Sequence, residues 1–119
     1  MERAVQATSA QQLMASAGRT LFKPTEKAPI YKMLAGDNVI HCDADLTEGY
    51  LYLPSLMQAS GEFYFIFSLE SSVHNITVKV PELDNDIAIL KSCDFVLLTC
   101  SGQGWFEVPV QFKGLGGGN

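Results

Sequence analysis

The pattern of apolar and polar residues changes along the chain, and from residue 39 onward it is typical of β-strands. In residues 76–80 apolar and polar side chains alternate, as they do in a strand with one buried face. Residues 63–69 are almost all apolar, which is typical of a central strand that is covered on both faces. The pattern predicts six strands, at residues 39–42, 50–53, 63–69, 76–80, 95–100 and 105–112.

The segments between the predicted strands are short, and several contain turn-forming residues. Residues 101–104, Ser-Gly-Gln-Gly, lie between the last two strands and predict a tight hairpin. We expect one helical turn within residues 55–61, and residues 82–92 allow either another turn or a short strand at 87–90. Short strands at regular spacing predict a mainly β fold, either an antiparallel β-sandwich or a small barrel. The expected buried residues include Phe63, Phe65, Phe67, Val78, Leu97 and Val108.

Residues 1–35 lack the strand pattern and predict an extended N-terminal arm. Residues 10–17 can form a short helix, because they are good helix formers and Gly18 can end it. Pro24 and Pro29 favour extended backbone in the rest of the arm. The expected domain organisation is an arm at 1–35, a β domain at 36–113 and a flexible glycine-rich tail at 114–119.

Charge is divided unevenly between the arm and the rest of the 119-residue chain. Residues 1–35 carry a net charge of +3, whereas residues 36–119 carry −8, and an acidic folded domain argues against nucleic-acid binding. The apolar run at residues 63–67 is far shorter than the roughly 20 residues of a membrane-spanning helix. The first residues also lack the apolar core of a signal peptide. We therefore expect a soluble protein that does not follow the secretory route.

Candidate catalytic and metal-binding residues are few. His41, Asp43 and Asp45 would share one face of a strand, but no second cluster has ligand spacing, and a strand end entering a polar turn explains them better. Three cysteines, at positions 42, 93 and 100, favour free thiols in a reducing compartment and lack the spacing of a redox or zinc motif. No nucleophile has a base beside it in a recognisable motif. The sequence predicts no enzyme, no metal and no cofactor.

Trp105, the single tryptophan, allows two interpretations. A tryptophan directly after a hairpin turn usually packs across strands and closes one end of a sheet, and we favour this structural role. The alternative is an aromatic platform that stacks on a sugar together with Tyr50 and Tyr52, which would make the chain a carbohydrate-binding domain.

Several short motifs follow one another between Asp45 and Val108. They are Leu-Pro at 53–54, the apolar strand at 63–67, Asn-Ile-Thr-Val at 75–78, Asp-Phe-Val-Leu-Leu at 94–98 and Gly-Gln-Gly-Trp at 102–105. This order resembles a small β module of tailed-phage virion proteins, in which an Asp-Gly turn usually precedes the tryptophan. Ser101 and Gly102 stand in place of that Asp-Gly here.

Modules of this kind occur in tail fibres and in head decoration, or cement, proteins. Because the chain has neither the repeats nor the coiled-coil stretches of a fibre, the resemblance implies a capsid decoration protein that binds and stabilises the head shell. It implies the major capsid protein as partner, a location in the virion and a homotrimer, with no nucleic-acid or membrane partner. A tail-fibre or tail-associated module is the alternative.

The arm is the expected means of attachment to the shell. A segment without a core of its own gains order when it binds a partner. Its apolar side chains would anchor it, and its basic side chains would mainly orient it, since exposed ion pairs contribute only about 0–1 kcal/mol. The expected partner-binding residues are the anchors Leu13, Met14, Leu21 and Phe22 and the basic residues Arg19, Lys23 and Lys27.

Overall fold

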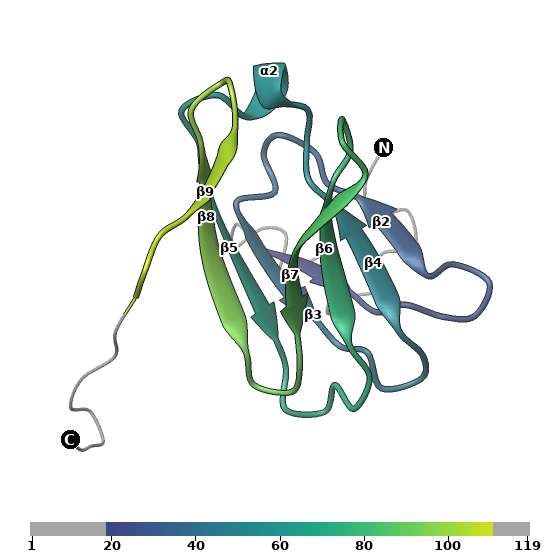
Figure 1. Ribbon diagram of the computed structural model, residues 1–119. Helices are drawn as coiled ribbons and strands as arrows, with labels where there is room; N and C mark the ends of the chain where they lie inside the picture. Colours follow the sequence, from purple (N-terminus) through teal and green to yellow (C-terminus); the bar gives the residue numbers. More distant parts are fainter. Residues whose placement is uncertain (1–18, 111–119) are drawn as a thin grey trace, which may run out of the picture.

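The computed structural model describes residues 19–110, and this part of the chain is mainly β (Figure 1). Its strands form one sheet of five strands and one of four. The five-stranded sheet has the order β1 (Thr20–Phe22), β3 (Val39–Cys42), β5 (Phe63–Ser68), β8 (Phe95–Cys100) and β9 (Trp105–Glu107). The four-stranded sheet has the order β2 (Ile30–Lys32), β4 (Gly49–Tyr52), β6 (Ile76–Val80) and β7 (Asn85–Leu90).

All six strands predicted from the pattern are present. The strands at 39–42, 76–80 and 95–100 have the predicted bounds, and the last one is shorter, because β9 ends at Glu107. The expected helical turn is α2 (Leu56–Ala59), which begins where the Ser55 hydroxyl accepts a hydrogen bond from the Gln58 amide at 3.2 Å. Residues 82–92 contain a strand, β7. Within residues 19–110 no helix is long and apolar enough to cross a membrane.

The expectation of an antiparallel fold is wrong, because both sheets are mixed. The parallel pairs are β1–β3 and β3–β5 in one sheet and β2–β4 and β4–β6 in the other. The antiparallel pairs are β5–β8, β8–β9 and β6–β7. From β1 to β6 the chain moves to the other sheet after every strand, so it returns to each sheet in the same direction. The two sheets do not close into a barrel. Alternating burial is the same in both kinds of pairing, and the sequence pattern therefore did not distinguish them.

Alternate residues of each strand contribute to one hydrophobic core. Tyr64 and Ile66 of β5 are fully buried there, with Ile76 and Val78 of β6. Of the residues expected to be buried, only Val78 is fully buried, which confirms that prediction. The others face the opposite side of the five-stranded sheet or its margin, because a strand places successive side chains on opposite faces. Phe63 is exposed, and Phe65, Phe67, Leu97 and Val108 are only partly buried.

The described part of the expected arm belongs to the two sheets. β1 pairs with β3 and β2 pairs with β4, so the expectation that residues 1–35 contain no strand is wrong. Phe22 and Met33 are core residues. The sequence pattern missed β1 and β2 because a three-residue strand is too short to show a recognisable alternation. Their backbone hydrogen bonds are nevertheless satisfied by pairing with β3 and β4. The helix expected at residues 10–17 lies outside the described residues.

Asp37 is a buried carboxylate that holds the β1–β2 region together. It accepts hydrogen bonds from the Thr20 hydroxyl at 3.0 Å, the Tyr31 hydroxyl at 2.7 Å and the Leu34 backbone amide at 2.8 Å. Only 2% of its surface is exposed. Since Thr20 lies in β1 and Tyr31 in β2, this one side chain links a strand of each sheet.

Candidate functional site

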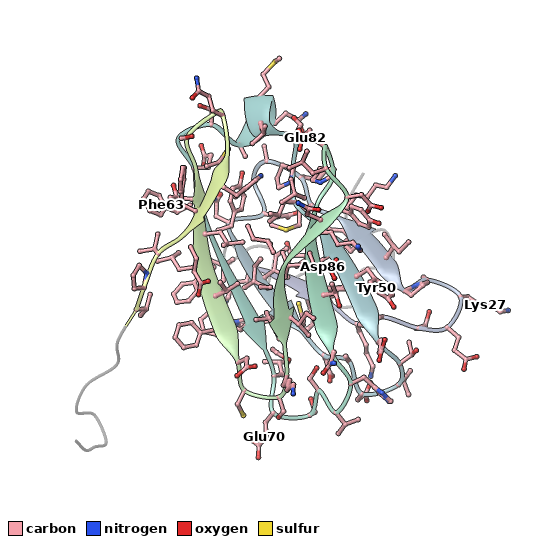
Figure 2. The ribbon with its side chains drawn as sticks, in the orientation of Figure 1. Lys27, Tyr50, Phe63, Glu70, Glu82 and Asp86 are labelled. Atoms are coloured by element: carbon pink, nitrogen blue, oxygen red, sulfur yellow. The ribbon has the colours of Figure 1, made fainter. Side chains whose placement is uncertain are left out.

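The side of the five-stranded sheet that faces away from the core carries a continuous set of apolar and aromatic side chains. In β5, Phe63, Phe65 and Phe67 alternate with the buried Tyr64 and Ile66, and Phe63 projects outward in Figure 2. The strand register places side chains of the same orientation beside them on β3 and β8. We call this set the aromatic face, and its residues are Leu21, Val39, His41, Phe63, Phe65, Phe67, Phe95 and Leu97.

The rings of the aromatic face contact one another across the strands. Phe65 and Phe67 stack with their ring centroids 4.5 Å apart, and the ring of Phe95 lies 5.7 Å from that of Phe65. His41 packs edge-on against Phe67 at 5.2 Å. These are the spacings at which aromatic pairs attract each other, so the rings hold one another in place on the sheet.

The described residues leave this face partly open to solvent. Phe63 is 54% exposed, and Phe106 on the neighbouring strand β9 is 56% exposed at the margin of the face. Monomeric proteins rarely expose large contiguous apolar patches, and such patches usually mark an interaction site.

His41 is the one titratable residue of the aromatic face. Burial lowers the pKa of His41 below its ordinary value of 6.5, and the positive charge of Arg19 lowers it further. The imidazole is therefore neutral at neutral pH, so the eight side chains of the face carry no charge there, and Arg19 is a cation close to His41. Seven of its eight residues are apolar, and His41 is the one polar side chain, so the arrangement is suited to binding an apolar surface.

The structure separates the partner-binding residues expected in the arm. Leu21 belongs to the aromatic face, where it pairs with His41, whereas Phe22 is buried in the core and packs against Tyr31 with ring centroids 5.8 Å apart. Leu13 and Met14 lie outside the described residues. Of the two expected apolar anchors that lie within residues 19–110, only Leu21 is therefore available to a partner.

The basic residues expected to orient the arm do not form one group either. Lys23 lies 3.5 Å from the Asp45 carboxylate of the same chain, so it is engaged within the β domain. Lys27 is exposed in the loop between β1 and β2, at the periphery of the molecule in Figure 2. Arg19 is exposed at the start of the described segment, just before β1.

The candidate metal ligands have separate structural roles. The Asp43 carboxylate accepts a hydrogen bond from the Ser71 hydroxyl at 2.8 Å, and Asp45 faces Lys23. His41 lies on the aromatic face. Among residues 19–110, no three histidine, cysteine, aspartate or glutamate side chains lie close enough together to hold a metal ion. The three cysteines are free thiols, and burial raises the pKa of Cys42 well above its ordinary range.

The aromatic residues of the carbohydrate-binding alternative lie in different sheets. Trp105 is on β9, half-buried against the core, with its ring centroid 5.6 Å from that of Tyr64. Tyr50 and Tyr52 are on β4 of the four-stranded sheet, where Tyr52 donates a weak hydrogen bond to Asp84 at 3.4 Å. The three rings therefore do not form one stacking platform.

The aromatic face was missed by sequence reasoning, although its signal is present in residues 63–69. A nearly continuous apolar run is typical of a strand that is covered on both faces. One face of β5 is covered by the core, and the described chain leaves the other partly uncovered. The run therefore corresponds to one buried face and one partly exposed face, whereas the pattern alone predicted two buried faces.

Comparison of the chain with protein-family models, with curated proteins and with solved structures gave no match.

Proposed function

We propose that the protein is a structural, non-enzymatic protein that attaches to a protein shell through the aromatic face. The observation that carries this proposal is a set of three phenylalanine rings, Phe65, Phe67 and Phe95, which contact one another and are partly exposed on the outer side of a central strand pair. The β5–β8 pair lies in the middle of its sheet, so the rings rest on a rigid base. A binding surface that is fixed before association loses little conformational entropy when the complex forms.

The shell in this proposal is a phage head, and the protein is a capsid decoration protein. The order of motifs between Asp45 and Val108, which resembles modules of tailed-phage virion proteins, supports this assignment. The partner is then the major capsid protein, the location is the virion and the assembled form is a homotrimer. A tail-fibre or tail-associated module remains the alternative, because the same resemblance includes both.

The aromatic face has enough apolar surface to contribute strongly to attachment. Full burial of a phenylalanine side chain is worth about 1.5–3 kcal/mol, although the loss of translational and rotational freedom offsets part of this. The eight side chains of the face are uncharged at neutral pH, so a partner surface that covers them needs no matching charges there, although Arg19 lies close to His41. An apolar patch on a capsid subunit, of the size of one small sheet, is the complementary surface.

Separation of heads and tails of the source particle tests the proposal. We expect the protein in the head fraction, and its presence only in tails would favour the fibre alternative. Absence from both fractions would reject a virion role.

A matched pair of variants tests the attachment surface. Phe65→Ser removes a central ring of the aromatic face, and we expect its affinity for heads to fall roughly tenfold or more. Val73→Ser changes a residue that is 73% exposed and lies outside the aromatic face, so its affinity should match that of the wild type. Equal binding by all three proteins would show that attachment uses another surface.

A further inference from the structure

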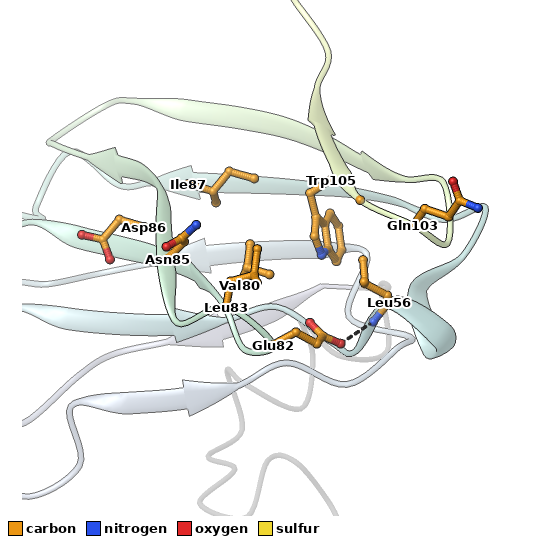
Figure 3. Close-up of a pocket in the computed structure, with 10 residues that line it drawn as sticks. Leu56, Val80, Glu82, Leu83, Asn85, Asp86, Ile87, Gln103 and Trp105 are labelled. Atoms are coloured by element: carbon orange, nitrogen blue, oxygen red, sulfur yellow. Dashed lines mark hydrogen bonds between the residues drawn. The ribbon is translucent and has the colours of Figure 1, made fainter.

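A pocket of about 320 Å³ lies near α2, and none of its lining residues belongs to the aromatic face (Figure 3). One wall is formed by β7 and the turn that precedes it, and the other by Trp105 of β9 and the turn that precedes that strand. Leu56 of α2 closes the end, and its backbone amide donates a hydrogen bond to Glu82 at 2.8 Å. The volume is within the range that binds small ligands or single large side chains.

The pocket is mainly apolar and has polar groups at its margin. The indole of Trp105 points into it in Figure 3, near Val80 and Leu83. The Trp105 Nε1 atom is buried and has no hydrogen-bond partner among the described residues. The other lining side chains are Leu56 and Ile87, which are apolar, and Glu82, Asn85, Asp86 and Gln103, which are polar.

The pocket adjoins a free sheet edge. β7 is the last strand of the four-stranded sheet, and within the described residues its backbone pairs only with β6. An exposed edge of this kind accepts an extended peptide as an additional strand, and a neighbouring pocket then selects one of its side chains. The edge and the pocket together are the two features that such peptide recognition requires.

The surroundings of the pocket are negatively charged. Glu82, Asp84 and Asp86 follow one another closely in the turn and at the start of β7. Lys79 is the nearby cation, with its Nζ atom 2.7 Å from Asp86 and 3.7 Å from Asp84. Three carboxylates and one ammonium leave an excess of negative charge, which favours a peptide with a basic residue.

We propose that this site binds residues 111–115 of a second copy of the chain. Their sequence, Gln-Phe-Lys-Gly-Leu, places a large apolar side chain directly before a basic one. In β7, Asp86 pairs with Lys79 on the outer face of the sheet, and Asn85 pairs with Val80 on the inner face. A strand added at this edge alternates in the same way, so Phe112 enters the pocket and Lys113 lies on the outer face beside Asp86.

The donor is a second copy because the chain leads away from its own pocket. After Trp105 in the pocket wall, the described chain continues away from the α2 end of the molecule (Figure 1). A contact between one copy's tail and another copy's pocket is heterologous, and such contacts build closed rings or open filaments. The inference does not depend on the proposed attachment to a shell, because it concerns a different surface.

Sedimentation velocity of the full-length chain tests this contact. Phe112→Asp disrupts the donor segment and leaves the pocket unchanged. Leu83→Lys places a charge at the margin of the pocket and leaves the donor segment unchanged. Leu83 is 69% exposed, so the substitution should not disturb the core. We expect wild-type chains to associate with increasing concentration, and each variant alone to associate at least about tenfold more weakly. An equimolar mixture of the two variants should form a complex of one chain of each, because one intact donor and one intact pocket remain.

Trp105 provides a second readout, since it is the single tryptophan and lines the pocket. Its emission should shift to shorter wavelength as wild-type chains associate and in the mixture of variants. Val73→Lys, a substitution of an exposed residue that does not line the pocket, is the matched control and should behave like the wild type. The proposal is overturned if wild-type chains stay monomeric, if either variant associates normally, or if the mixture forms no complex. A change in emission without a change in mass would indicate binding within one chain and would also overturn it.

Discussion

Asp37 shows how much one side chain contributes to the arrangement of the first strands. Its carboxylate accepts hydrogen bonds from Thr20, Tyr31 and Leu34, which belong to β1, β2 and the following turn. Short strands of three residues gain little from their own pairing, so this cluster has a large part in fixing them. Nothing in the sequence pattern distinguished Asp37 from the other acidic residues of the chain.

We expect Asp37→Ala to reduce the free energy of unfolding by about 2–4 kcal/mol, because it leaves several donors without their acceptor. Asp37→Asn retains one acceptor oxygen and should cost less. Urea denaturation, followed by circular dichroism, measures both changes. If Asp37→Ala unfolded at the same urea concentration as the wild type, the cluster would have no role in stability.

His41 should make stability depend on pH. Because its pKa is lowered in the folded state, the unfolded chain binds the proton more tightly, and the free energy of unfolding falls as the pH falls below the unfolded value of 6.5. The loss is complete once the pH is below the folded-state pKa. We expect His41→Gln to remove this part of the pH dependence, as measured by denaturation well above and well below 6.5.

The comparison must be made as a difference between the two proteins, because carboxylates also titrate at low pH. Protonation of His41 in the folded protein would also place a charge on the aromatic face, so partner binding should weaken as the pH falls to the lowered folded-state pKa. Identical pH profiles for the wild type and His41→Gln would contradict this account of the face.

At the scale of elements, the strands were predictable and their pairing was not. Alternation located β6 and short apolar runs located β3 and β8, all three with their observed bounds. The pattern of β5 predicted a strand but did not show which of its faces is buried, because both sets of alternate residues are apolar. Parallel pairing depends on where the chain crosses between sheets, which local alternation does not encode.

Gly49 shows how a loop and a strand pack closely in this fold. A Cβ atom at this position would lie 2.7 Å from the Pro24 ring, in the loop after β1, and 3.0 Å from side-chain atoms of Ile76 and Phe22. We expect Gly49→Ala to lower the free energy of unfolding by about 1–3 kcal/mol, because the core is overpacked there. Gly36→Ala is the matched control, since no atom lies within 4 Å of its added Cβ. Thermal melting of both variants measures the difference, and equal melting temperatures would contradict the close packing.

At the scale of the whole molecule, the boundary between arm and body has a direct test. The sequence pattern predicted that residues 1–35 are a separable extension, whereas this segment includes β1, β2, Phe22 and Met33. We expect deletion of residues 1–35 to abolish cooperative unfolding, because it opens the core and leaves β3 and β4 as new sheet edges. Deletion of residues 1–18 keeps both strands and should preserve a cooperative transition. Thermal melting followed by circular dichroism measures both truncations. A cooperative transition of the chain that lacks residues 1–35 would contradict the assignment of β1 and β2 to the folded body.

The most direct test of the account is a cryo-EM map of the source particle. The account predicts that the protein lies on the head, with the outer side of β5 and β8 against the shell and with Phe65 and Phe67 covered by a capsid subunit. Protein on the head with its aromatic face open to solvent would contradict the proposed attachment surface. Its location only on the tail, or its absence from the particle, would contradict the proposed function as a decoration protein.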